Sequence, residues 1–232
     1  MSLSNSETAL RQELVRYGAW LWSRSLAHGS AGNLSARLDD GSILVTPTNS
    51  SLGSLDPTKI SKVSAEGLLL SGDKPSKEAF FHLAVYQARP SAHAIVHLHS
   101  TFAVALSCLC HSDSSDVLPP LTAYQVMRVG RLPLVPYFHP GDHRLAEAVA
   151  ATARRHHAML LSNHGPIVAG VTLRDAVHAY DELEETAKLS FIIGSRPVRP
   201  LTCEMVDELN AIFPTSPEAV HPIAASTMSN VS

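Results

Sequence analysis

Apolar residues at helical spacing predict several helices along the chain. Leu10, Leu14 and Leu21 fall on one face of the first. Thr172, followed three positions later by Asp175, has the spacing of a helix N-cap for the longest one. Helices are therefore expected before the glycine-containing break at residues 29–32 and at residues 76–86, 101–109, 142–155, 172–193 and 201–213.

Short runs rich in β-branched and aliphatic residues alternate with these helices and predict strands. Asp39-Asp40-Gly41 joins the first two as a hairpin-type turn, and residues 163–166 form a tight connection between the last two. Tight connections of this kind favour antiparallel pairs, so we expect an α/β fold with a largely antiparallel sheet covered by helices. Strands are expected at residues 33–38, 42–46, 63–70, 94–99, 132–137, 158–162 and 167–169.

Composition sets the scale of the fold. With 232 residues, 45% of them hydrophobic, the chain can bury one full core, and we expect a single domain over residues 1–213. Residues 214–232 are rich in Ser, Thr, Ala and Pro and are predicted to be a disordered tail. Cys108 and Cys110 lie in an apolar run and are expected in or near the core, with no assigned role.

Several functional classes lack support in the sequence. The net charge of −3 comes without a basic stripe, which argues against nucleic-acid binding. No apolar stretch is long enough to span a membrane, and the polar residues 1–7 do not resemble a signal segment, so we expect a cytoplasmic protein. Neither a P-loop pattern nor a GxGxxG turn between a strand and a helix is present, which disfavours a nucleotide-binding fold.

Histidine is the unusual component, with 13 in the chain. In a strand, alternate side chains share a face, so His97 and His99 point the same way while Val96 and Leu98 enter the core. Two imidazoles at this spacing could ligate one zinc ion. Taken alone, however, such a pair is more often two ordinary polar residues on a half-buried strand.

Two further residues give the pair more weight. His164 lies between two apolar strands, where a rigid sheet can hold it, and could supply a third imidazole. Glu78 lies near the start of a predicted helix and could ligate a cation or transfer protons; alone, it would more often be a solvated first-turn residue. Among the other histidines, His82 is expected to be structural, and the role of His139 stays open.

Five ordered motifs resemble those of the class II aldolase family, typified by fuculose-1-phosphate aldolase and including ribulose-5-phosphate epimerase and the non-enzymatic adducin head domain. The similarity covers about residues 10–193. The motifs are Ala31-Gly32-Asn33-Leu34-Ser35, Thr46-Pro47-Thr48, Pro75-Ser76-Lys77-Glu78, His97-Leu98-His99 and Asn163-His164-Gly165.

The resemblance implies a three-layer α/β/α sandwich, assembled as a homotetramer with active sites near subunit interfaces. It implies one Zn²⁺ per subunit, or another divalent ion, on His97, His99 and His164, with Glu78 as a fourth ligand that also moves protons. The family's phosphate pocket falls on five polar residues: Asn33, Thr48, Asn49, Ser76 and Lys77.

This sequence departs from the aldolase pattern within that pocket. Asn49 stands where the aldolase has glycine, and Lys77 stands where it has a second serine. The lysine adds a positive charge suited to phosphate, but the change argues against an identical substrate. Glu78 favours the lyase branch, because the epimerase branch carries aspartate there. A non-catalytic scaffold like the adducin head is the second alternative, but that head lacks the metal histidines, whereas this chain has all three.

Within the family, the chain is most similar to the subgroup that decarboxylates 3-oxo-tetronate 4-phosphate to dihydroxyacetone phosphate and CO₂. This similarity extends to Gly72-Asp73-Lys74-Pro75-Ser76-Lys77-Glu78, Val126-Met127-Arg128-Val129-Gly130, Pro140-Gly141-Asp142 and Glu182-Leu183-Glu184-Glu185-Thr186-Ala187-Lys188.

The first alternative is a class II aldolase that cleaves a ketose 1-phosphate through the same enediolate. An aldolase needs a donor to the aldehyde oxygen, a part that a tyrosine plays in the family, often from a neighbouring subunit. Tyr124 is the candidate catalytic residue for it, with a surface or interface role as the alternative. Arg128 could instead meet a substrate carboxylate.

Overall fold

The computed structural model describes residues 7–139 and 141–214. An eight-stranded sheet, in the order β4-β3-β2-β1-β5-β8-β7-β6, lies at its centre. The strands are β1 (Asn33–Arg37), β2 (Ile43–Val45), β3 (Ser61–Val63), β4 (Leu69–Ser71), β5 (Ala94–His97), β6 (Leu134–Val135), β7 (Ala158–Leu161) and β8 (Pro166–Gly170). The helices are α1 (Glu7–Ser23), α2 (Ala79–Ala88), α3 (Thr101–Ser107), α4 (Ala123–Arg128), α5 (Arg144–Ala153), α6 (Leu173–Ile193) and α7 (Cys203–Ile212), with a 3-10 turn η1 (Leu52–Ser54).

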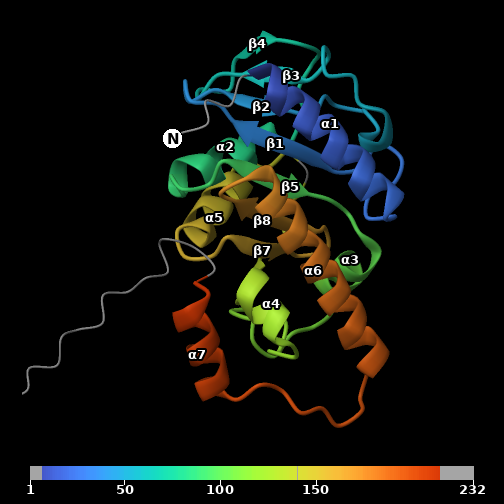
Figure 1. Ribbon diagram of the computed structural model, residues 1–232, viewed down its shortest axis with the longest axis vertical. Coiled ribbons are helices and arrows are strands. Elements are labelled where there is room, and N and C mark those ends of the chain that lie inside the picture. Colours follow the sequence, from blue (N-terminus) through green and yellow to red (C-terminus); the bar gives the residue numbers. More distant parts are fainter. Residues whose placement is uncertain (1–6, 140, 215–232) are drawn as a thin grey trace, which may run out of the picture.

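Helices cover both faces of the sheet, with α1 and α6 on one side and α2 and α5 on the other (Figure 1). Successive side chains of a strand point to opposite faces of the sheet, so each strand contributes residues to the core on either side. In β5, Ala94 and Val96 join the core beneath α1 and α6, whereas Ile95 joins the core beneath α2 and α5. Because both faces are buried, β5 has apolar residues on both of its faces, and the predicted α/β class is confirmed.

The expectation of a largely antiparallel sheet needs correction, because the sheet is mixed. β6 pairs with β7 in parallel, while the pairs from β4 to β7 are antiparallel. Parallel neighbours require a crossover connection, and α5 supplies it between β6 and β7. The helix was expected there, but its consequence for strand direction was missed.

Several local elements differ from their predicted extents. The strand expected at residues 63–70 is a hairpin, because Gly67, at φ +91°, turns the chain between β3 and β4. Helix α4 was not expected; it begins where the Thr122 hydroxyl accepts a hydrogen bond from the Gln125 amide. Cys108 and Cys110 are exposed rather than core residues, because α3 ends before them.

Two further expectations concern the C-terminal tail and membrane-spanning helices. The predicted tail, residues 214–232, lies outside the described residues except for Pro214. Among the described helices, none combines the length and apolar character needed to cross a membrane.

Candidate metal and anion site

The predicted site residues gather at one edge of the sheet, where several central strands begin or end. His97 is the last residue of β5 and pairs with Asn33, the first residue of β1. On its other side His97 pairs with Ile167 of β8. His164 lies in the turn between β7 and β8. Antiparallel pairing thus brings His164 and Asn33 to the end of β5.

Two glycines allow the segments at this edge to approach closely. Gly32 has φ +81°, and a Cβ there would lie 2.9 Å from the His97 carbonyl oxygen. A Cβ on Gly165 would lie 2.5 Å from the Leu98 carbonyl oxygen. A larger residue at either position would force the turn away from the β5 end, so both glycines help set the distances within the site.

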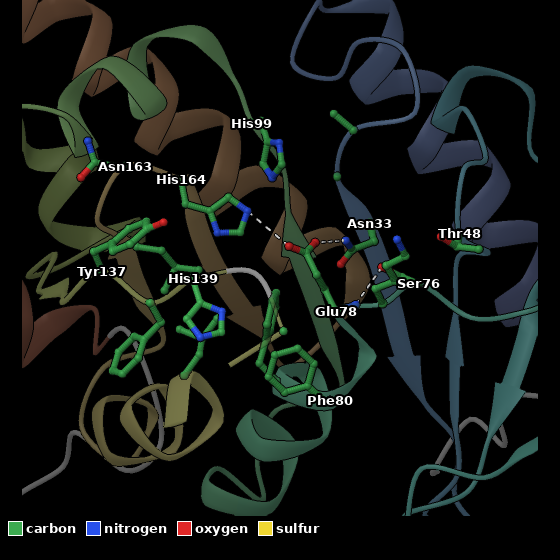
Figure 2. A pocket seen from close by; sticks show the side chains of 18 of the residues that line it. Asn33, Thr48, Ser76, Glu78, Phe80, His99, Tyr137, His139, Asn163 and His164 are labelled. Carbon is green, nitrogen blue, oxygen red and sulfur yellow. Dashed lines mark hydrogen bonds and ion pairs between the residues drawn. The ribbon is translucent and has the colours of Figure 1, made fainter. Parts of the chain in front are cut away.

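Glu78 approaches the histidines from the start of α2, where it occupies the N-cap position. The Ser76 hydroxyl accepts a hydrogen bond from the Glu78 amide (3.2 Å). The carboxylate lies 3.2 Å from His164 Nε2 and 3.4 Å from His97 Nε2. Asn33 Nδ2 donates to the same carboxylate at 2.7 Å. Figure 2 shows the Glu78 carboxylate between His164 and Asn33.

The four donors fit a single divalent ion. The ligating atoms of Glu78, His97, His99 and His164 lie within 4.8 Å of one another, and the His97 and His99 Nε2 atoms are 3.1 Å apart. Ligands about 2.0–2.1 Å from a tetrahedral zinc ion are about 3.3 Å from one another. The Nδ1 atom of His97 donates to the Pro166 carbonyl oxygen (2.9 Å), which leaves the Nε2 lone pair directed at the cluster.

Electrostatics also favour a cation in the cluster. Burial raises the pKa of Glu78, but the charge of His97 and hydrogen bonds from His164 and His97 outweigh it, so its pKa lies well below the usual range. Burial, followed by the charges of His97 and His164, lowers the pKa of His99 to about 4. An ionised Glu78 carboxylate and a neutral His99 imidazole are the protonation states in which these two residues bind a metal.

All five predicted phosphate-pocket residues line one cavity of about 610 Å³ together with Glu78, His99 and His164. The loop with Thr48 and Asn49 is tied to the loop with Ser76 and Lys77, since the Thr48 amide donates to the Lys74 carbonyl and the Ser76 amide donates to the Thr46 carbonyl. Asn49 has φ +57°. Asparagine tolerates this left-handed conformation better than most residues, so it can occupy a position where the aldolase has glycine.

Two predicted residues lie elsewhere. Tyr124 is 60% exposed on α4, and Arg128 is in the last turn of that helix. Neither of them is among the described residues that line the cavity. Any role of Tyr124 in the chemistry would therefore require another copy of the chain.

The opposite wall of the cavity was not foreseen. It includes Tyr137, His139 and Asn163, which lie across from Asn33 and Thr48 (Figure 2). Tyr137 and His139 follow β6, and Asn163 follows β7. Parallel strands end at the same edge of a sheet, so the parallel pairing of β6 with β7 would have indicated this wall.

Comparisons with known proteins identify the family of this chain. The model of the family described as Class II Aldolase and Adducin N-terminal domain matches residues 12–191. The chain belongs to this family. Among the solved structures, YgbL from Escherichia coli aligns with a TM-score of 0.86 and 54% identity, covering 88% of this chain and 98% of that one. An L-fuculose 1-phosphate aldolase aligns with a TM-score of 0.80 and 27% identity, covering 88% and 95%.

Two kinds of curated relative match the chain at different identities. The 3-oxo-tetronate 4-phosphate decarboxylase of Escherichia coli K12 is 54% identical over 205 residues, which cover 88% of this chain and 97% of the relative. That of Haemophilus influenzae is 48% identical over 204 residues, with 88% and 97% covered. The L-fuculose phosphate aldolase of Escherichia coli K12 is 36% identical over 166 residues, with 71% and 74% covered.

Proposed function

We propose that this chain is a metal-dependent carbon–carbon lyase that decarboxylates 3-oxo-tetronate 4-phosphate to dihydroxyacetone phosphate and CO₂. The observation that carries the proposal is the cavity in which a cluster of three histidines and a carboxylate meets two polar loops suited to an anion. The relatives narrow the substrate, because the decarboxylases are 48–54% identical and the fuculose phosphate aldolase 36%.

Each part of the cavity has a task in this reaction. The loops with Thr48, Ser76 and Lys77 bind the substrate phosphate through hydroxyl and ammonium donors. When the C1–C2 bond breaks, its electron pair forms an enediolate across C2 and C3. In this proposal the ionised Glu78 carboxylate takes up a proton from solvent and passes it to C2 in place of the lost carboxylate. This step regenerates the Glu78 carboxylate, and the reaction consumes one proton overall.

We propose that zinc is the metal, one ion per subunit, held by Glu78, His97, His99 and His164. A divalent ion there supplies Lewis-acid charge where the enediolate oxygens develop. The donor set also suits other first-row ions, so metal analysis of the purified protein tests the choice. Activity that survives exhaustive chelation would exclude a metal-dependent mechanism.

The reaction itself is tested by incubating purified protein with 3-oxo-tetronate 4-phosphate. We expect stoichiometric release of CO₂ and dihydroxyacetone phosphate. The alternative is aldol cleavage of a ketose 1-phosphate, which would release an aldehyde without CO₂. Tyr124→Phe separates the two further. A decarboxylation needs no donor to an aldehyde oxygen, so this variant should retain turnover, whereas an aldolase should lose it.

We also propose that residues 1–213 form one catalytic domain and that the protein works as a cytoplasmic homotetramer. Family resemblance supports this assembly, and the exposed position of Tyr124 is compatible with a contact between copies. Light scattering on the purified protein tests the assembly. A monomer with full activity would contradict it and would remove Tyr124 from consideration as a catalytic residue.

A further inference from the structure

A polar seam runs between α2 and β1, inside an otherwise apolar region. On the helix, Glu78, His82 and Tyr86 are spaced four residues apart and therefore share a face. On the strand, Asn33 and Ser35 alternate with apolar residues and also share a face. His82 is fully buried, and Asn33 is 3% exposed.

Hydrogen bonds link these side chains into one series. His82 Nε2 lies 2.5 Å from Asn33 Oδ1, and His82 Nδ1 lies 2.7 Å from the Ser35 hydroxyl. The Ser35 hydroxyl lies 2.8 Å from that of Tyr86. At the other end, Asn33 Nδ2 donates to Glu78 Oε2 (2.7 Å). The series thus runs from a buried tyrosine to the carboxylate of the candidate metal site.

The donor and the acceptor of each hydrogen bond in this series follow from the ionised state of the Glu78 carboxylate. An ionised carboxylate only accepts, so Asn33 must turn its Nδ2 toward Glu78 and its Oδ1 toward His82. His82 must then carry its proton on Nε2 and accept from Ser35 on Nδ1. Ser35, having donated, accepts from Tyr86. Burial lowers the pKa of His82 to about 3, and the neighbouring charge of His97 adds to that effect, so the ring is neutral and has a single tautomer.

We propose that His82 is a positioning residue for the metal site: its Nε2–H fixes the Asn33 amide so that Nδ2 holds the Glu78 carboxylate against His97 and His164. Without this donor the amide can rotate and turn Oδ1 toward the carboxylate, where two acceptors repel. Tyr86 is itself buried, 4% exposed. The series therefore leads to no solvent at that end, and it orients groups rather than relaying protons. The metal part of this inference rests on the proposed function.

Variants of His82 separate positioning from packing. In His82→Gln the amide nitrogen takes approximately the place of Nε2, whereas in His82→Asn the side chain is too short to reach Asn33. Tyr86→Phe is the matched control, because it removes a buried hydrogen bond of the same seam without touching His82 or Asn33. Each zinc-loaded protein is measured for its unfolding midpoint, its zinc affinity in competition with a chelator, and its kcat and KM.

We expect His82→Asn to lower both zinc affinity and kcat about 10- to 100-fold with KM little changed, as is typical of residues that orient a metal ligand. His82→Gln should stay within about threefold of wild type, and Tyr86→Phe should lower only the unfolding midpoint. The loss caused by His82→Asn should disappear in an Asn33→Ala background. A folded His82→Asn protein with unchanged zinc affinity, or an equal loss without Asn33, would overturn the proposal.

A measurement on the unmodified protein guards against a variant that does not fold. Long-range proton–nitrogen correlation spectra report which ring nitrogen of each histidine carries a proton, and the signal missing from His82→Gln assigns His82. We expect an Nε2–H tautomer at pH 7.5. An Nδ1–H tautomer or an imidazolium would refute the orientation of Asn33. This readout depends on neither zinc nor substrate, so it remains decisive even if the proposed function fails.

Discussion

The candidate site has two sides that are built differently. We call the cluster of Glu78, His97, His99 and His164 the metal side, and the loops with Thr48, Asn49, Ser76 and Lys77 the anion side. On the metal side, His97 ends a central strand, is fully buried, and has its ring fixed by the Pro166 carbonyl. On the anion side, Asn49 and Lys77 are exposed on loops. Sheet register sets the first group, whereas loop conformation sets the second. Geometry on the metal side should therefore tolerate little change, while the anion side can vary with substrate.

Glu78 joins the two sides. It follows Ser76 and Lys77 directly in sequence, yet its carboxylate lies against His97 and His164. A change in the anion loops can therefore reach the metal through Glu78, and the variants below measure how separate the two sides are.

The largest effect is expected from His97→Ala. Removing this buried ligand should abolish zinc binding and lower turnover by on the order of 1,000-fold, because the charge supplied by a metal contributes several kcal/mol to the transition state. Metal analysis and steady-state kinetics on the same preparation check both effects. His93→Ala is the control, since His93 is exposed just before β5. Turnover that persists without bound zinc would place the chemistry outside the histidine cluster.

Glu78→Gln is expected to come next. The amide keeps the size of the side chain but cannot carry the proton to C2, so kcat should fall by about 100-fold while KM changes little. Kinetics and a chelator competition assay measure turnover and zinc affinity separately. Glu185→Gln, on the exposed face of α6, should behave as wild type. If Glu78→Gln raised only KM, the residue would belong to the anion side instead.

A smaller effect is expected from Lys77→Ser, which restores the residue of the aldolase pattern. Loss of one charged hydrogen-bond donor from an exposed position should raise KM about tenfold and leave kcat and zinc affinity nearly unchanged. Lys74→Ser is the matched control, because Lys74 lies in the same segment but not in this cavity. A fall in zinc affinity with Lys77→Ser would show that the two sides are not separable.

Sequence reasoning could reach the metal side because its pattern is local. The alternation at His97 and His99 follows from strand geometry, and His164 lies in a tight turn between two strands. The rest needed information that spacing does not contain. The wall with Tyr137 and Asn163 depends on a parallel pair of strands, and the proposed phosphate-binding residues were accessible only through the family resemblance. Equally, the seam at His82 required knowing that α2 lies over β1.

The difference between local sequence patterns and tertiary arrangement also explains which helices and strands were predicted. Helix α6 and strands β5 and β7 have strong periodicity and clear ends, and they were located within a few residues. The hairpin of β3 and β4 looks like one continuous run in sequence, because β4 is a short edge strand with three exposed residues, including Leu69. A strand that pairs with a neighbour on one edge only and buries neither face shows little alternation of apolar and polar residues in its sequence.

The smallest predicted effect concerns pH and tests the seam at His82. Because the folded-state pKa of His82 is about 3, below the ordinary value of 6.5, the unfolded chain binds a proton that the folded chain excludes. The contribution of His82 to the free energy of unfolding should therefore be fully present above about pH 6.5 and decrease toward pH 3, by at most about 1.4 kcal/mol per pH unit.

Urea unfolding of wild type and His82→Gln from pH 7.5 to 4.5 isolates the contribution of His82, because the other histidines are present in both proteins. His93→Gln should run parallel to wild type. If the wild-type and His82→Gln curves also run parallel, His82 does not exclude a proton, and the single tautomer inferred from Glu78 is wrong.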